Sequence, residues 1–163
     1  MRSYGLFYLA AVCTLGQVIT AVLFEVPANY AAAALALLLG LFAALFIYWP
    51  MFALYRYGRV PQGAGYMQTT AVVDRGPYTI IRHPQYLGYM LINLTFMLSN
   101  PFWPAFILGF VAILCYYLYA QQEDGRLLES FGPVYRDYML RVPGFNVPLG
   151  LLRLLHDMDG QYE

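Results

Sequence analysis

Three long runs without a charged side chain dominate the pattern of the chain. They cover Ser3–Phe24, Val26–Tyr55 and Pro84–Gln122, and they are 22, 30 and 39 residues long. A helix needs about 20 apolar residues to cross the hydrocarbon core of a bilayer. Each of the first two runs therefore predicts one membrane-spanning helix, and the third is long enough for two.

A turn is predicted inside the third run, where residues 99–104 read Ser-Asn-Pro-Phe-Trp-Pro. Prolines disfavour helix at and just before their own positions, so the run should fold into a helix hairpin. The sequence thus predicts an all-α integral membrane protein forming one domain over residues 1–163. The expected segments are spans at about 4–24, 29–55, 84–99 and 103–121, a cytoplasmic loop at 56–83 and a cytoplasmic helical tail at 122–163.

The tail should contain three helical pieces. Residues 123–131 continue the fourth span into water, and Gly132-Pro133 stop that helix and start a short one. Pro143-Gly144 end the short helix. Apolar residues at helical spacing over 147–158 then predict a helix lying on the membrane surface.

Composition supports a membrane protein over a soluble one. Hydrophobic residues make up 61% of the chain and charged residues 11%, against about 25% charged residues in an average soluble domain. The net charge is zero, so no nucleic-acid partner is indicated. Cys13 and Cys115 lie in apolar runs and are predicted to be inert thiols.

The positive charges predict the orientation. All nine are arginines, and none falls between the first two spans or in the 99–104 turn. Four spans place every arginine on one side, which the positive-inside rule assigns to the cytoplasm. We therefore expect a multi-pass protein of a prokaryotic cytoplasmic membrane with both termini cytoplasmic. Four arginines are predicted only to mark this face: Arg2, Arg56, Arg59 and Arg153.

One cluster of chemically useful residues precedes the third span. It contains Gly76-Pro77-Tyr78, Arg82-His83-Pro84, Tyr86 and Gly88. Proline suits the first turn of a helix, and the backbone N–H groups of a helix N-terminus are unpaired and favour anions. A ligand carrying a carboxylate would suit this place. An ordinary interfacial anchor of Arg and Tyr is an equally good explanation.

A second cluster follows the fourth span and begins with the acidic pair Glu123-Asp124. An acid near the membrane surface can bind an ammonium or sulfonium group, although such a pair is more often a solvated helix face. The cluster continues with Leu127, Phe131-Gly132, Tyr135, Tyr138, Arg141 and Val142-Pro143.

Other chemistries find little support. The two histidines, His83 and His156, do not form a pair within the bilayer that could ligate a haem. No motif for a metal, for a phosphate-binding loop or for a serine nucleophile occurs, and no metal is predicted. The spans carry no charged residue of the kind a transporter uses.

Taken together and in this order, the two clusters resemble the membrane methyltransferases related to isoprenylcysteine carboxyl methyltransferase and phospholipid N-methyltransferase. The resemblance covers residues 76–143 and has one departure, because the usual Glu-Glu pair is Glu123-Asp124 here. It implies an S-adenosylmethionine site on the cytoplasmic face. By this resemblance the cofactor-binding residues are Arg82, His83, Tyr86, Gly88, Glu123, Asp124 and Tyr78.

The resemblance also implies methyl transfer to a lipophilic or prenylated small molecule, or to a membrane lipid. Arg141 resembles the position that holds the acceptor carboxylate, so an isoprenylcysteine-like carboxylate is ranked first. Arg141 and Glu123 are then the catalytic candidates, with Glu123 or His83 accepting a proton if the acceptor is an amine. A phospholipid amine and a small thiol remain alternatives. A non-catalytic membrane module and a redox protein related to the sterol reductases are the rivals from other classes.

Overall fold

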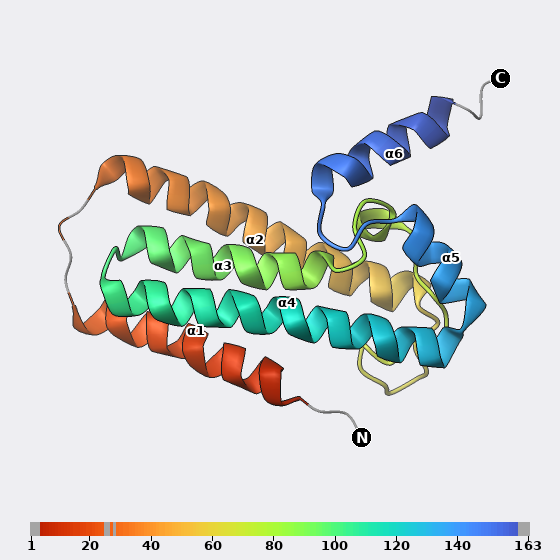
Figure 1. Cartoon of the computed structure of the whole chain (residues 1–163), viewed down its shortest axis with the longest axis horizontal. Helices are drawn as coiled ribbons and strands as arrows, with labels where there is room; N and C mark the ends of the chain where they lie inside the picture. Colours follow the sequence, from red (N-terminus) through yellow and green to blue (C-terminus); the bar gives the residue numbers. More distant parts are fainter. Residues whose placement is uncertain (1–3, 25–26, 28, 160–163) are drawn as a thin grey trace. The chain divides into compact units, whose positions relative to one another are not determined.

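The computed structural model describes residues 4–24, 27 and 29–159, with side chains described as far as His156. Helices account for all regular structure among these residues, which confirms the all-α prediction. In chain order they are α1 Gly5–Leu23, α2 Tyr30–Tyr57, the 3₁₀ helix η1 Gly76–Thr79, α3 Pro84–Ser99, α4 Trp103–Phe131, α5 Pro133–Arg141 and α6 Val147–Asp159 (Figure 1).

Three of these helices are long and apolar enough to cross a membrane: α1, α2 and α4. The predicted third span has the predicted bounds, but α3 contains 16 residues. At 1.5 Å per residue it reaches only about 24 Å, against a hydrocarbon core of about 30 Å. The count of four spans therefore stays a prediction. Arg2, one of the charges used to predict the topology, lies outside the described residues.

The loops and tail follow the prediction closely, with small differences. Helix α2 continues through the buried Pro50 and ends at Tyr57, so the central loop starts two residues later than predicted. This loop also contains η1, which the sequence did not predict. In the tail, the extension of α4 to Phe131 and the two later helices confirm the predicted pieces.

The chain forms two compact units, and both α2 and α4 contribute to each. The first unit comprises residues up to Leu45 together with Tyr86–Gln122, and the second comprises Phe46–Gln85 together with the chain from Glu123 onward.

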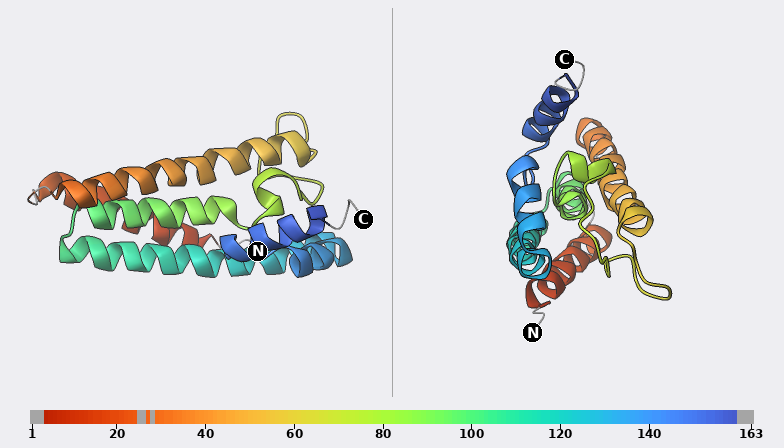
Figure 2. Two further views of the ribbon diagram at one scale, coloured as in Figure 1. Left: turned by 90° about the horizontal axis from the view of Figure 1, so that it is seen from above. Right: turned by 90° about the vertical axis from the view of Figure 1, so that its right-hand side faces the viewer.

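Aromatic rings and buried polar groups hold the first unit together. Figures 1 and 2 show α3 lying beside the apolar part of α4, with α1 alongside. The Phe7 ring of α1 packs on Tyr89, Tyr116 and Tyr119 with ring centroids 5.6–6.2 Å apart. Gln17 is fully buried, and its Nε2 donates to the carbonyl of Ala105 at 2.9 Å. Buried amides of this kind join helices where water is absent.

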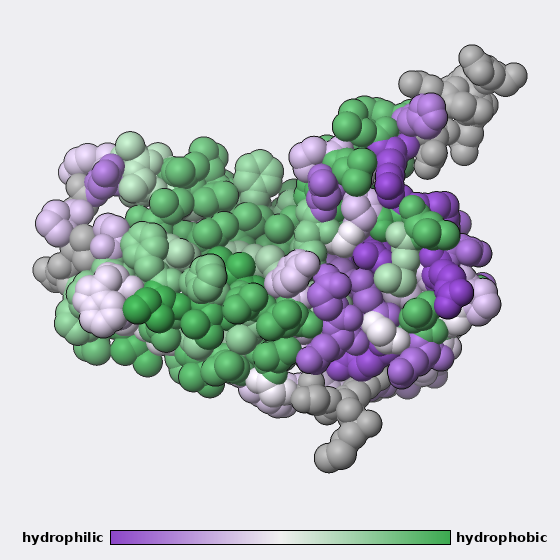
Figure 3. All heavy atoms as spheres, viewed as in Figure 1, coloured by the Kyte–Doolittle hydropathy of each residue, from purple (hydrophilic) through white to green (hydrophobic). Residues whose placement is uncertain are grey.

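Hydrophobic side chains cover the visible face of this unit in Figure 3. Many large apolar residues of α1 and α2 are exposed, among them Val12, Leu37 and Leu41 at more than 60%. A soluble protein rarely exposes so continuous an apolar surface, whereas lipid solvates one.

The second unit has its own small core. Six buried residues form it, contributed by α2, the central loop, η1, α5 and the turn that follows: Ala53, Val73, Tyr78, Tyr135, Tyr138 and Val142. Leu127, Leu128 and Phe131 of the extended α4 pack against this core. Hydrophilic residues gather over this unit in Figure 3. The core is what brings residues 76–84 of the first motif and the second motif into one compact unit.

Candidate cofactor site

The first motif folds as a tight turn that leads into α3. Gly76 has a φ of 63°, a conformation that L side chains rarely adopt, and Pro77 occupies the start of η1. The hydroxyl of Thr79 donates to the Gly76 carbonyl at 2.8 Å and closes the turn. Pro84 then begins α3, so Arg82 and His83 directly precede this helix, as predicted.

The backbone N–H groups of Arg82 and His83 are already hydrogen-bonded. They donate to the carbonyls of Pro143 at 2.9 Å and Gly144 at 3.2 Å, in the turn that follows α5. The prediction that unpaired backbone donors receive an anion is therefore wrong at these two positions. An anion bound next to them would be held by side chains.

Asp124 is the centre of the site. Its Oδ2 lies 3.2 Å from Nη2 of Arg82, and its Oδ1 lies 2.9 Å from Nε2 of His83. The hydroxyl of Tyr135 donates to the same Oδ1 at 2.6 Å. Asp124 is 5% exposed and His83 is 3% exposed. A carboxylate this well surrounded fixes the positions of the two side chains that precede α3.

The surroundings of Asp124 favour its charged form. Asp124 lies in α4 beyond the predicted span 103–121. Burial by itself raises the pKa of Asp124, but the hydrogen bond and charge of His83, the hydroxyl of Tyr135 and the charge of Arg82 outweigh it and lower the pKa below its ordinary value. Burial and the neighbouring carboxylate raise the pKa of Tyr135, so this phenol stays a donor.

Arg82 retains donors for a ligand. Its Nε and Nη1 are buried and have no hydrogen-bond partner in the part of the chain that the structure describes. A buried donor left unpaired costs about 1–3 kcal/mol, and that cost is recovered when an acceptor arrives. The guanidinium is thus held by Asp124 at one nitrogen, while its other two nitrogens lack an acceptor among the described residues. A carboxylate, such as that of S-adenosylmethionine, is an acceptor for a guanidinium.

Tyr78 of η1 contacts α5. It is buried, and its carbonyl accepts a hydrogen bond from the Tyr138 hydroxyl at 2.8 Å. This contact joins α5 to η1. Burial raises the pKa of Tyr138, so the hydroxyl remains protonated and the bond persists at neutral pH.

The sequence did not single out Tyr135, Gly144 or Phe145 as site residues. Tyr135 lies within the second motif, and its place in that motif was the available signal. Gly144 contributes through its backbone carbonyl, and the Phe145 ring lies 5.4 Å from the His83 ring. Any residue can supply a backbone carbonyl, and Phe145 lies outside the motif, so neither contact could be recognised from the sequence.

Glu123 does not join the Asp124 cluster. Successive residues of a helix point about 100° apart, so the two acids face different directions. Glu123 is half-buried, and no hydrogen bond or ion pair of its side chain occurs within the described residues. Of the acidic pair, Asp124 is thus engaged by the protein, and a ligand-binding role of Glu123 stays a prediction.

Arg141 lies at the end of α5 and is exposed. It lines a hollow of about 360 Å³ with Arg153 and His156 of α6. Nη1 of Arg153 donates to the Arg141 carbonyl at 3.0 Å. No hydrogen bond or ion pair joins Arg141 to Asp124 or Arg82 among the residues described.

Tyr86 and Gly88 belong to the first unit. Both are buried in α3, and the Tyr86 ring packs on Tyr119 of α4 with centroids 5.7 Å apart. Their proposed contact with a cofactor stays a prediction.

Within residues 4–24, 27 and 29–159, no group of three or more His, Cys, Asp or Glu side chains is placed to hold a metal ion.

Fold and site together define a helical membrane protein with a partly buried, carboxylate-anchored arginine directly before one of its helices. The phospholipid methyltransferase family matches residues 30–134, which is most of the chain and includes Arg82, His83 and Asp124. The protein belongs to this family and is a membrane methyltransferase. No curated protein and no solved structure matches the chain.

Proposed function

We propose that the protein transfers a methyl group from S-adenosylmethionine to a lipid acceptor at the cytoplasmic face of the membrane. The observation that carries this proposal is the pair of buried, unpartnered nitrogens of Arg82 in a family of methyltransferases. They suit the carboxylate of the cofactor, because a guanidinium binds a carboxylate through two parallel hydrogen bonds.

Different residues are assigned to different parts of the cofactor. Arg82 takes the carboxylate, Asp124 and Tyr135 hold Arg82 and His83 in place, and Glu123 attracts the cationic groups of the cofactor. When bound, S-adenosylmethionine supplies a methyl group activated by its sulfonium. Tyr86 and Gly88 are assigned to the cofactor by family resemblance.

The family match favours a phospholipid amine as the acceptor. A headgroup amine is protonated at neutral pH and must lose a proton before its nitrogen can attack the methyl group, and Glu123, the less buried of the two acids, is the base we assign. The protein's remaining task is to align acceptor and donor and to keep water out.

A lipophilic carboxylate of the isoprenylcysteine type is the second candidate acceptor. The exposed guanidinium of Arg141, beside Arg153 and His156, can bind a carboxylate. A carboxylate needs no base at the chemical step, so this reaction would not depend on Glu123 as a proton acceptor.

Isothermal titration of the purified protein with S-adenosylhomocysteine tests cofactor binding. Labelled S-adenosylmethionine, supplied with phosphatidylethanolamine or with a prenylated cysteine, identifies the acceptor. Absence of heat and of thermal stabilisation at millimolar ligand would contradict the proposal and favour a non-catalytic module, because a bound ligand stabilises the folded state by mass action.

A further inference from the structure

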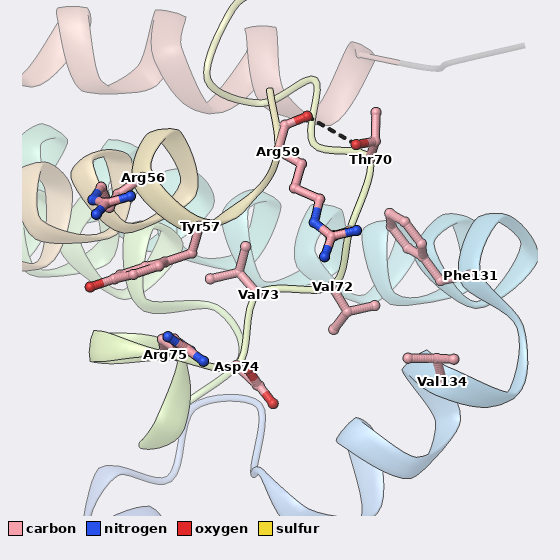
Figure 4. Close-up of a pocket in the computed structure, with 11 residues that line it drawn as sticks. Arg56, Tyr57, Arg59, Thr70, Val72, Val73, Asp74, Arg75, Phe131 and Val134 are labelled. Atoms are coloured by element: carbon pink, nitrogen blue, oxygen red, sulfur yellow. Dashed lines mark hydrogen bonds between the residues drawn. The ribbon is translucent and has the colours of Figure 1, made fainter. Parts of the chain in front are cut away.

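A second basic site lies away from the Arg82 cluster but within the same unit. A hollow of about 600 Å³ opens between the end of α2, the central loop and the junction of α4 with α5 (Figure 4). Hollows of this size hold small ligands or lipid headgroups. Arg56, Arg59 and Arg75 line it together with one acid, Asp74.

The charges around this hollow are not balanced. Three guanidiniums and one carboxylate leave two positive charges in excess (3 − 1 = 2). The ion pairs found among the described residues have Asp124 as their acid, so none of these three arginines is in an ion pair there. Like charges gathered in one hollow repel each other unless an anion joins them.

Aromatic contacts fix two of the arginines. The guanidinium carbons of Arg56 and Arg75 lie 5.8 Å and 5.5 Å from the centroid of the Tyr57 ring. This arrangement is a cation–π contact for each. A guanidinium over a ring keeps its N–H edge available for an acceptor.

The backbone holds the third arginine in an unusual conformation. Arg59 has a φ of 49°, and it is the one non-glycine residue with positive φ in the described chain. Thr70 maintains it by two contacts: its N–H donates to the Gly58 carbonyl at 2.9 Å, and its hydroxyl donates to the Arg59 carbonyl at 2.9 Å. A side chain at Gly58 would overlap Thr69 and the Leu54 carbonyl. Such conformations persist where the surroundings require them and cluster at binding sites.

The geometry points to a phosphate-binding site formed by Arg56, Arg59 and Arg75, and we propose that it holds the phosphate of a membrane lipid. Arginines present planar forks of donors that match phosphate oxygens. Arg56 lies in the last turn of α2, a helix long enough to span the membrane, and the headgroups of the lipids lie at that level. Phe131 and Val134 form an apolar wall beside the charges, which suits the less polar part of a lipid. This proposal does not depend on methyl transfer.

The test measures lipid retention by the delipidated full-length protein with native mass spectrometry. Phosphatidylglycerol is compared with a diacylglycerol of the same acyl chains, which lacks the phosphate. We expect phosphatidylglycerol to be retained preferentially, and Arg59→Gln to weaken its binding about tenfold or more, as expected for the loss of a charge-assisted hydrogen bond. The triple change of Arg56, Arg59 and Arg75 to Gln should abolish the preference.

Arg136→Gln is the matched control, because Arg136 is exposed on α5 and does not line the hollow. Circular dichroism and gel filtration verify that each variant is folded. Titration with inorganic phosphate identifies the source of the ligand: binding of the lipid alone assigns the site to the bilayer, and binding of both shows a general phosphate site. Equal retention of the two lipids, or unchanged phosphatidylglycerol binding in the folded triple variant, would overturn the proposal.

Discussion

Arg82 and Asp124 form a largely buried ion pair, with Nη2 3.2 Å from Oδ2 and side chains 12% and 6% exposed. The pair links the residue before α3 to the extension of α4. One nitrogen of Arg82 is held by Asp124, and the other two are buried without a partner in the described chain. The ion pair therefore fixes the guanidinium and leaves two of its donors for a proposed ligand. This relationship is the basis of the predictions on ligand affinity and on stability.

Replacement of Arg82 should remove the anion receptor. Arg82→Gln is expected to weaken binding of S-adenosylhomocysteine about tenfold or more, measured by isothermal titration, because charge-assisted hydrogen bonds to the carboxylate are lost. Arg82→Lys should recover only part of the affinity, since an ammonium lacks the planar fork. Arg136→Gln, on the exposed side of α5, serves as the control. An unchanged affinity in a folded Arg82→Gln protein would remove this residue from the proposed site.

Neutralising Asp124 should destabilise the second unit. Asp124→Asn leaves the charge of Arg82 buried without its partner, and the free energy of unfolding should fall by about 3 kcal/mol. Asp137→Asn alters an exposed acid of α5 and should change it by less than about 0.5 kcal/mol. Denaturation in detergent, followed by tyrosine fluorescence, measures both. Similar stabilities for the two variants would contradict a structural role of the ion pair.

The contribution of Asp124 should also depend on pH. Its pKa in the folded protein lies below the ordinary value of 3.8, so its stabilising effect is complete above that value and is lost as the pH falls through the lower folded pKa. The stability difference between the wild type and Asp124→Asn should therefore shrink as the pH falls below about pH 4. A difference that persists unchanged at pH 2 would show that the charge of Asp124 is not responsible.

Two glycines should respond oppositely to alanine. A Cβ at Gly150 of α6 would overlap the carbonyl of Ile80, so Gly150→Ala should lower the melting temperature by forcing α6 away from the segment after η1. A Cβ at Gly125 of α4 meets no atom within 4 Å, and Gly125→Ala should stabilise the helix by up to about 1 kcal/mol. Thermal unfolding of both variants measures the contrast. A Gly150→Ala protein as stable as the wild type would show that α6 does not pack as described.

The predicted orientation can be tested by cysteine labelling. In a background with Cys13 and Cys115 replaced by alanine, Gln62→Cys and Asp137→Cys should react with an impermeant maleimide from the cytoplasmic side. Pro101→Cys, in the turn between α3 and α4, should react from the opposite side, because four spans put that turn across the membrane. Labelling of Pro101→Cys and Gln62→Cys from the same side would show that α3 does not cross the membrane.

Much of the fold could be predicted from the sequence, because the positions of membrane helices and their ends depend on residues close together in the chain. Uncharged runs of sufficient length predict helices in a membrane whatever their neighbours, and proline and glycine determined where the helices end. The predicted third span therefore agrees with α3 at both bounds. The tail helices were also predicted, since Gly132-Pro133 and Pro143-Gly144 interrupt any helix.

The site was only partly readable, because its geometry depends on contacts between distant residues. The sequence by itself placed Arg82 and His83 directly before a helix, and placed an acidic pair just beyond the predicted end of the fourth span. The tertiary structure decided which acid meets them: the helical repeat turns Asp124 toward Arg82 and His83 and turns Glu123 away. It likewise placed Arg56 and Arg59, which the sequence showed only as markers of the cytoplasmic face, around one hollow with Arg75. Residue type and spacing determine which groups a chain carries, whereas packing of the Tyr78, Tyr135 and Tyr138 core determines which of them face each other.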